Sequence, residues 1–166
     1  MKTIITILCS TLFCFNLVGQ AGKKHFVLGM EKHDNGDFKG AIDAYTKCIE
    51  LEPNLAEAYF NRGMAKNEAK DYYNAIGDFL TCINLKPAVA AMAYCNMGFS
   101  KLNVEDYKGA IADCSKSIAL DANIASAYLN RALSKKALNV TFCADMKKAM
   151  ELGDKNAINY YPLYCK

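Results

Sequence analysis

Apolar residues recur at steps of three and four positions along several stretches of the chain. Ile42, Tyr45 and Ile49 keep this spacing, and two later stretches, residues 74–87 and 109–120, repeat it. Such spacing is typical of amphipathic helices. Further helical patterns, each opening on a tyrosine, cover residues 59–66, 94–101 and 128–135. Because the two kinds of helix alternate, the sequence predicts a series of helical hairpins.

The hairpin pattern returns at a nearly constant interval. Ala41, Ala75 and Ala110 occupy equivalent positions, 34 and then 35 residues apart. An internal period of this length indicates repeated units that stack to bury a common core. Small residues also recur on the first helix of successive hairpins, as Gly29, Gly63 and Gly98. We expect these positions to let the two helices of a hairpin approach closely.

The turns carry residues suited to helix caps. An aspartate precedes the second helix of three hairpins, at Asp37, Asp71 and Asp106. Its carboxylate can accept a hydrogen bond from a backbone N–H in the first helical turn. After Pro53 ends one hairpin, Asn54 with Glu57 is expected to cap the next helix.

These residues resemble the tetratricopeptide repeat, whose pattern combines Leu-Gly, Ala, an aromatic and Pro at fixed offsets. The matching positions are Leu28-Gly29, Ala41, Tyr45 and Pro53, then Tyr59, Gly63, Ala75, Phe79 and Pro87, then Tyr94, Gly98 and Ala110, and finally Tyr128. The later units depart from the pattern at Cys114, Ala122 and Ala132, and Lys32, Lys66, Lys101 and Lys135 stand where the family often has Tyr. The resemblance implies an all-α fold, a right-handed superhelical stack of antiparallel hairpins.

The resemblance also implies the division of the chain. About four repeat-like units are expected near residues 22–55, 56–90, 91–124 and 125–153. The fourth unit is two residues short. Residues 154–166 are expected to form a C-terminal capping helix, which Pro162 should end early.

The first residues have the features of a secretory signal peptide. Lys2 gives a positive end, residues 4–18 are largely apolar, and Gly19-Gln20-Ala21 supplies small residues at a cleavage site. A membrane anchor is the alternative, but the apolar stretch falls short of the roughly 20 residues that span a bilayer. We therefore expect residues 1–21 to be removed, leaving no stable membrane span. The mature protein would be secreted or periplasmic, in the cell envelope.

Composition and charge narrow the class of partner. The chain has 166 residues, of which 52% are hydrophobic and 22% charged, so it suits one compact domain rather than a disordered segment. The formal net charge of +3 is spread along the sequence without a basic run. A nucleic-acid partner is therefore not expected.

Little in the sequence points to catalysis, a metal or a cofactor. His25 and His33 are the only histidines, and no cysteine pair has the spacing of a zinc site. Four cysteines, Cys48, Cys82, Cys95 and Cys114, occupy apolar helix positions and are expected to be buried free thiols. The triplet Asn139-Val140-Thr141 matches a glycosylation signal, but turn or helix-cap duty is favoured.

Cys143 and Cys165 differ from the other cysteines because they flank the last unit and the terminal helix. In an exported protein a disulfide between them would clamp that helix onto the stack. The alternative is a thiol-dependent enzyme that uses Cys143 or Cys165.

The resemblance implies that the first helices line a concave groove that binds a peptide or protein segment. The matching groove residues are Phe26, Met30, Phe60, Asn61, Met64, Cys95, Asn96, Phe99, Leu129, Asn130 and Leu133. Three of them, Asn61, Asn96 and Asn130, recur at one position and could bind a ligand backbone. Because positions such as Phe26, Met30 and Met92 carry no cation, a clamp for an acidic peptide terminus is disfavoured.

The expected function is a non-catalytic protein-interaction module or scaffold with an apolar groove, although self-association could also shield that surface. The opposite, convex face is expected to be polar, through Asp43, Lys47, Asp78, Asp113 and Lys116 on the second helices.

Overall fold

A computed structural model of the chain describes residues 20–165, and helices dominate this part. The first described helix covers residues 20–34. The elements after it are α2 (Phe38–Leu51), α3 (Ala56–Glu68), α4 (Tyr72–Leu85), the short 3₁₀ helix η1 (Pro87–Val89), α5 (Ala90–Asn103), α6 (Tyr107–Leu120), α7 (Ala125–Ala137), α8 (Cys143–Glu151) and α9 (Lys155–Tyr164). No strand occurs between residues 20 and 165, so the all-α fold class is confirmed.

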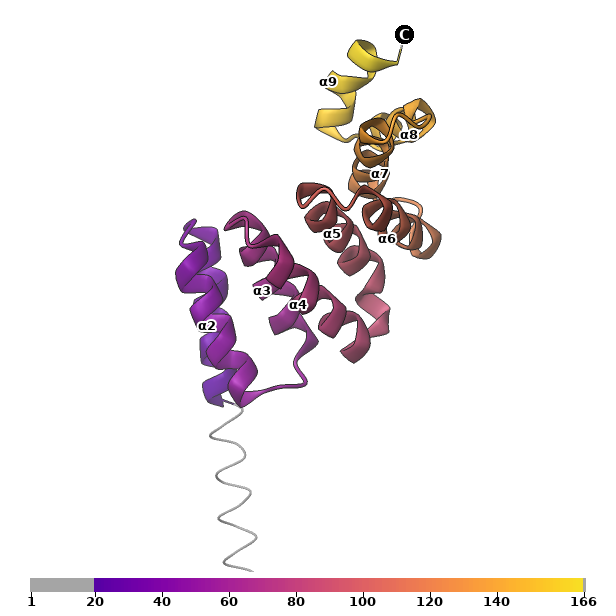
Figure 1. Cartoon of the computed structure of the whole chain (residues 1–166). Coiled ribbons are helices and arrows are strands. Elements are labelled where there is room, and N and C mark those ends of the chain that lie inside the picture. The colour runs from indigo at the N-terminus through magenta and orange to yellow at the C-terminus, as the bar shows by residue number, and fades with distance from the viewer. Residues whose placement is uncertain (1–19, 166) are drawn as a thin grey trace, which may run out of the picture.

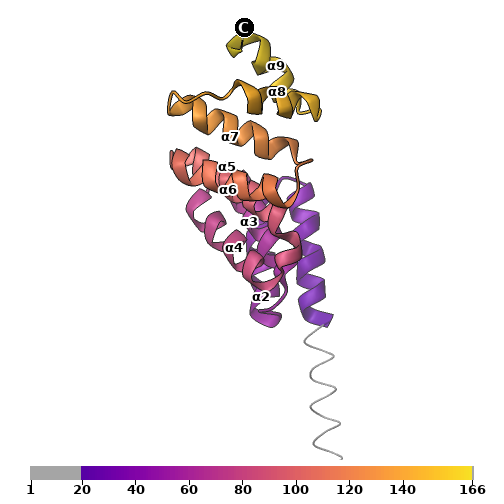
Figure 2. The same cartoon turned by 90° about the vertical axis from the view of Figure 1, so that its right-hand side faces the viewer.

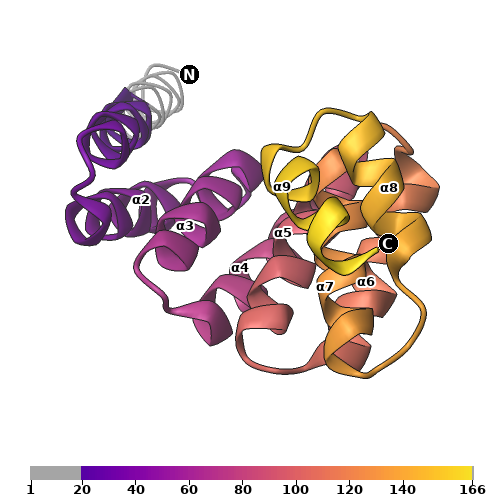
Figure 3. The same cartoon turned by 90° about the horizontal axis from the view of Figure 1, so that it is seen from above.

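The helices stack as hairpins along one direction. Contacts join α3 to α4, α5 to α6 and α7 to α8 within hairpins, and α4 to α5 and α6 to α7 between them. Figures 1 and 2 show the stack running from the first described helix to α9 at the opposite end. Seen from above, successive hairpins are turned relative to one another (Figure 3). This arrangement is the α-solenoid that the repeat predicts.

The caps follow the sequence in two turns and differ in a third. Asp37 accepts a hydrogen bond from the backbone N–H of Gly40, and Asp106 accepts one from Gly109. At both glycines an added Cβ would collide with the aspartate carboxylate. The equivalent residue in the first turn of α4 is Asn74, whose side-chain amide donates to the Asp71 carboxylate instead.

The predicted cap of α3 by Asn54 and Glu57 is wrong. The N-cap residue is Leu55, and no side chain caps this helix end. Glu57 instead forms an ion pair with Lys86 at the end of the following helix. The hydrogen bond from Lys86 lowers the pKa of the Glu57 carboxyl. The Glu57 side chain therefore links the start of α3 to the end of α4 in the same hairpin, and it does not cap α3.

The small residues of the first helices make room for large side chains from the second helices. A Cβ added to Gly63 would lie 2.8 Å from the ring of Phe79, and one added to Gly98 would lie 2.5 Å from Cys114 Sγ. Phe79 and Cys114 are fully buried. The close approach expected from the sequence is therefore made mainly by side chains, with backbone contact added at Gly98.

Acidic residues on the second helices are buried, which corrects the expected polar face. Asp78 and Asp113 are only 5% and 3% exposed, whereas Asp43, Lys47 and Lys116 are exposed as expected. Each buried carboxylate faces the first helix of its own hairpin, and it lies against a lysine twelve positions earlier in the sequence.

The buried ion pairs repeat from hairpin to hairpin, but the number of cations paired with each aspartate differs. Asp78 accepts hydrogen bonds from Arg62 Nε and Nη2 at 2.9 and 2.7 Å and pairs with Lys66 at 2.7 Å. Asp113 pairs with Lys101 at 2.6 Å. The position equivalent to Arg62 is Met97, which cannot form an ion pair.

In the last hairpin Asp145 is held by Arg131 and Lys135, with its carboxylate 2.6 and 2.7 Å from their nitrogens. Burial alone would raise the pKa of Asp145, but the hydrogen bonds from these two cations lower it below its ordinary value. In the first hairpin Ala44 replaces the aspartate, and Lys32 pairs with Asp37 in the turn at 2.8 Å.

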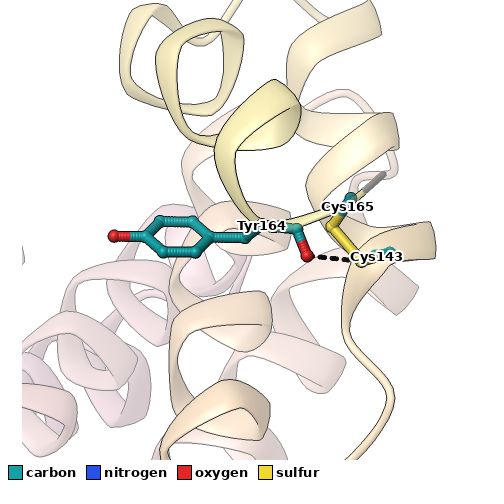
Figure 4. Close-up of a disulfide and its surroundings, with 3 residues drawn as sticks. All are labelled: Cys143, Tyr164 and Cys165. Atoms are coloured by element: carbon teal, nitrogen blue, oxygen red, sulfur yellow. Dashed lines mark hydrogen bonds between the residues drawn. A yellow bond between two sulfur atoms is a disulfide. The ribbon is translucent and has the colours of Figure 1, made fainter.

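The C-terminal helix α9 packs on α8, and a disulfide links the start of α8 to the end of α9. Cys143 and Cys165 lie with their Cα atoms 5.5 Å apart and their sulfur atoms bonded (Figure 4). The carbonyl oxygen of Tyr164 lies 3.7 Å from Cys143 Sγ. Contrary to the expectation for Pro162, α9 continues past this residue to Tyr164, and the Cys165 N–H closes it on the Tyr161 carbonyl.

The proposed signal segment falls mostly outside the described residues. The structure describes the chain from residue 20 onward, where the first described helix already includes residues 20 and 21. Within residues 20–165, no helix combines the length and the apolar character that crossing a membrane requires.

Candidate functional site

A cavity of about 430 Å³ opens between the first helices of successive hairpins. Its walls come from α3, α5 and α7 and from the start of α9. We call it the central cavity. It is lined by Met64, Asn67, Glu68, Cys95, Asn96, Phe99, Leu102, Asn103, Ser126, Leu129, Asn130, Leu133, Asp154, Asn156 and Tyr160.

The structure gathers most of the predicted groove residues around two cavities. Met64, Asn96, Phe99, Leu129, Asn130 and Leu133 line the central cavity, together with Cys95. Phe60 and Asn61 line a second cavity of about 250 Å³, which we call the apolar cavity because Val89, Met92 and Cys82 complete most of its wall. A shallower third cavity shares Met92 with the apolar cavity and Ser126 and Asp154 with the central one, so the three adjoin.

Two predicted groove residues lie outside these cavities. Phe26 is half-buried and packs on Tyr45 with ring centroids 5.8 Å apart, so it belongs to the core around Ala41 and Tyr45. Met30 is 46% exposed but borders none of the three cavities. The first described helix therefore contributes no side chain to the central cavity.

The exposure of the lining residues is uneven. Phe99 is 38% exposed and meets Tyr72 edge to face. Leu129 is 6% exposed and packs in the core around Met146. Phe60 is half-buried against Phe79. Phe99 is therefore the ring most available to a ligand, and Leu129 forms part of the cavity floor.

The three repeated asparagines differ in their hydrogen bonds. Asn96 Nδ2 donates to the Met92 carbonyl of its own helix at 3.0 Å. The side-chain amides of Asn61 and Asn130 make no hydrogen bond to any residue in the described part of the chain. Asn130 is also only 7% exposed. The amides of Asn61 and Asn130 are therefore free to form hydrogen bonds with a ligand in the cavities that they line.

Sequence reasoning missed the residues that α9 brings to the central cavity. Asp154, Asn156 and Tyr160 belong to the terminal helix and its cap, which the repeat pattern assigns only a covering role. Glu68 at the end of α3 was missed as well. The capping pattern of Asp154 before α9 was readable in the sequence, but its place beside α5 and α7 depends on how the last hairpin turns.

The carboxylates of Glu68 and Asp154 are the only charged side chains that line the central cavity. Asp154 Oδ1 accepts hydrogen bonds from the backbone N–H groups of Asn156 and Ala157, both at 2.9 Å. No ion pair within residues 20–165 involves Glu68 or Asp154. The lining therefore combines apolar side chains, amides and negative charge.

The four thiols predicted to be buried are buried and unpaired, at Cys48, Cys82, Cys95 and Cys114. Burial raises the pKa of each. Cys95 Sγ lies 3.2 Å from Ser126 Oγ at the wall of the central cavity. A thiol with a raised pKa stays protonated at neutral pH and is a poor nucleophile.

The histidines lie apart from the cavities. His25 and His33 are half-buried on the first described helix, and the His33 ring packs edge to face on Phe38. Among the described residues, no group of three His, Cys, Asp or Glu side chains could hold a metal ion.

Known repeat families match part of the sequence. One family model, described as TPR repeat, matches residues 29–68, and another, described as tetratricopeptide repeat, matches residues 56–89. None of the curated proteins matches the chain.

Solved structures match the fold over most of the chain. MamA is 24% identical with a TM-score of 0.73, over 82% of this chain and 81% of its own. The TPR domain of Arabidopsis OM64 is 22% identical with a TM-score of 0.69, over 72% and 98%. The first TPR of Spaghetti (RPAP3), solved with the HSP90 peptide SRMEEVD, is 22% identical with a TM-score of 0.69, over 73% and 95%. The family matches show tetratricopeptide repeats within residues 29–89, and the solved structures show that the described chain has the α-solenoid fold of TPR proteins.

Proposed function

We propose that this protein is a non-catalytic interaction module that holds a peptide or protein segment in the central cavity. The observation that carries the proposal is the cavity itself, whose walls are the first helices of successive hairpins. TPR structures of the same fold include one that holds a peptide. Adjoining cavities that join side chains from several hairpins suit a chain segment better than a small molecule.

The chemistry of the lining supports an extended or helical segment. Phe99 and Tyr160 offer ring surface, and Met64 offers a flexible apolar side chain that adapts to shape. Asn130 can donate to and accept from a ligand backbone. The adjoining apolar cavity, beside Phe60, is large enough to take one apolar side chain of the same segment.

We also propose that the protein works outside the cytoplasm, after removal of the segment described above as a signal peptide. In that compartment the Cys143–Cys165 bond would persist and hold α9 in place. N-terminal sequencing of exported protein should find a first residue near Ala21 or Gly22. An exported chain that still begins at Met1 would contradict this part of the proposal.

The binding proposal is tested by comparing substitutions on the two faces. Phe60→Ala with Phe99→Ala removes a ring from each cavity, at about 2 kcal/mol or more for each ring that is a binding hot spot. Lys47→Ala with Lys116→Ala changes the exposed convex side. Proteins captured from the native envelope fraction should be lost with the first pair and retained with the second.

Circular dichroism and thermal melting must show that both variants fold, because Phe60 also packs on Phe79. Retention of the captured proteins by a folded cavity variant would refute the assignment of the site. If the wild-type protein is a dimer that the cavity substitutions dissociate, the occupant is a second copy of this chain.

A further inference from the structure

We propose that the central cavity selects a segment that carries a basic side chain beside an apolar one, and that Asp154 and Glu68 bind the basic group. The inference rests on the proposed binding function and specifies its partner. It concerns the charge of the ligand, which the repeat pattern leaves open.

The first support is the sign of the charge around the cavity. Glu68 and Asp154 both line it, and no lysine or arginine does. Both acids lack an ion-pair partner among the described residues, although lysines elsewhere in the stack pair with Asp78, Asp113 and Asp145. Lys155 borders only the adjoining third cavity. An acidic segment in the central cavity would meet two like charges and no cation.

The second support is the way Asp154 is held. Its Oδ1 atom accepts both backbone N–H groups at the start of α9, which fixes the carboxylate in place. Its Oδ2 atom has no hydrogen-bond partner within residues 20–165. A carboxylate positioned in this way can accept a charge-assisted hydrogen bond from a ligand without first being ordered.

The third support is independent of charge. Asn130 is more than nine-tenths buried, lines the same cavity, and finds no hydrogen-bond partner in the described chain. Its amide nitrogen and oxygen are not among the fully buried polar atoms that lack a partner, so a ligand in the cavity can reach them. Asn130 on α7, Phe99 on α5 and Asp154 before α9 line the same cavity, so a ligand backbone that bonds to Asn130 can bring its side chains to both.

A lysine or arginine side chain fits this combination of walls. Its aliphatic stem can pack on Phe99, Leu129 and Leu133 while its charged end reaches the carboxylates. The ring of Tyr160 lines the cavity as well, and aromatic faces attract cations.

The experiment selects binders from a random linear peptide library on the purified protein and then measures the affinity of synthetic copies by fluorescence anisotropy. Each selected peptide is also made with its Lys and Arg replaced by Gln. The site variant is Asp154→Asn with Glu68→Gln, which removes both charges and keeps a good N-cap for α9. The matched control, Asp43→Asn with Glu50→Gln, removes two exposed carboxylates from α2 and changes the net charge equally.

We expect the selected peptides to be enriched in Lys or Arg next to apolar residues. The site variant and the Gln peptide should each weaken binding by about tenfold, and combining them should add little, because both remove the same charge pair. The control variant should bind as the wild type does. Added salt should weaken the wild-type complex more than the site variant's complex.

Three results would be decisive against the inference. Enrichment of acidic peptides, equal binding by the site variant, or an equal loss in the control would overturn the charge selection while leaving cavity binding intact. If no selected peptide is weakened by Phe60→Ala with Phe99→Ala, the proposed function itself fails and the charge selection fails with it.

Discussion

The lysine that faces Asp113 is expected to matter more for stability than the equivalent lysine of the preceding hairpin. Within residues 20–165 Lys101 is the only cation paired with Asp113, and the two side chains are 23% and 4% exposed. Asp78 is paired with two cations, Arg62 and Lys66, so Arg62 still holds the carboxylate when Lys66 is replaced. Replacing Lys101 with Met therefore leaves a buried carboxylate alone, whereas the same change at Lys66 does not.

The structure sets the size of the difference. Removing one partner of a buried pair typically destabilises by about 3 to 5 kcal/mol. Because Lys101 is partly exposed, we take the low end, about 3 kcal/mol, for Lys101→Met. For Lys66→Met we expect about 1 kcal/mol, since two arginine hydrogen bonds still hold the carboxylate. In melting temperature these losses correspond to roughly 9 °C and 3 °C for a domain of this size.

The assay is urea and thermal unfolding at neutral pH under non-reducing conditions. Lys108→Met serves as the control, because this lysine is exposed on the adjacent helix α6. A double variant, Lys101→Met with Asp113→Leu, should recover most of the loss, since an apolar pair can replace a buried ion pair. Equal losses at Lys66 and Lys101, or no recovery in the double variant, would show that the buried pairs do not act as the structure implies.

Three other perturbations test separate parts of the fold. Cys165→Ser should lower the melting temperature under non-reducing conditions, by a free energy of about 3 kcal/mol in the loop-entropy account, and a reductant should erase the difference from wild type. Ser117→Cys should raise stability by about 1 kcal/mol, because Ser117 Oγ is buried without a hydrogen-bond partner and the equivalent positions are Cys48 and Cys82; an unchanged midpoint would contradict this. The folded-state pKa of Asp145 is lowered, so the carboxylate stabilises the fold above the ordinary pKa of about 3.9, and this stabilisation is lost as the pH falls through the lowered value. The difference in unfolding free energy between wild type and Asp145→Asn should therefore shrink on acidification, and a constant difference would refute the argument.

The repeat made most of the fold predictable from the sequence. Helix positions, the packing of small residues and the burial of four thiols all follow from one pattern, because equivalent residues in a stack meet equivalent surroundings. Asp106 caps its helix for the same reason as Asp37. Where one residue of the pattern changes, as at Asn74, the local structure changes in a way that the size of the new side chain explains.

The burial of Asp78 and Asp113 was not predicted because periodicity within one helix describes only that helix. It shows which residues share a face, but not which side chain of a neighbouring helix covers them. A signal was present in the sequence, since Lys66 and Lys101 each stand twelve positions before the aspartate. Reading lysine and aspartate as a recurring pair would have placed both inside the hairpin.

The α9 residues of the candidate site were beyond the repeat pattern for a different reason. A terminal helix has no equivalent elsewhere in the chain, so no other unit indicates where its side chains lie. α9 has ten residues and buries only Ala157 fully. A helix this short is marginal on its own, so its position depends on Asp154 at its start, its packing on α8 and the bridge from Cys165.

This dependence connects the stability of the C-terminal end to the proposed site. The same Asp154 carboxylate that caps α9 also lines the central cavity, and Tyr160, six residues later, lines it as well. The contacts that hold α9 on α8 therefore also position Asp154 beside α5 and α7. The hairpins supply Glu68, Phe99 and most of the amides, whereas α9 and its cap supply Asp154, Asn156 and Tyr160. A stack with the same repeats and a different terminal helix would keep the cavity floor and lose much of the charge selection.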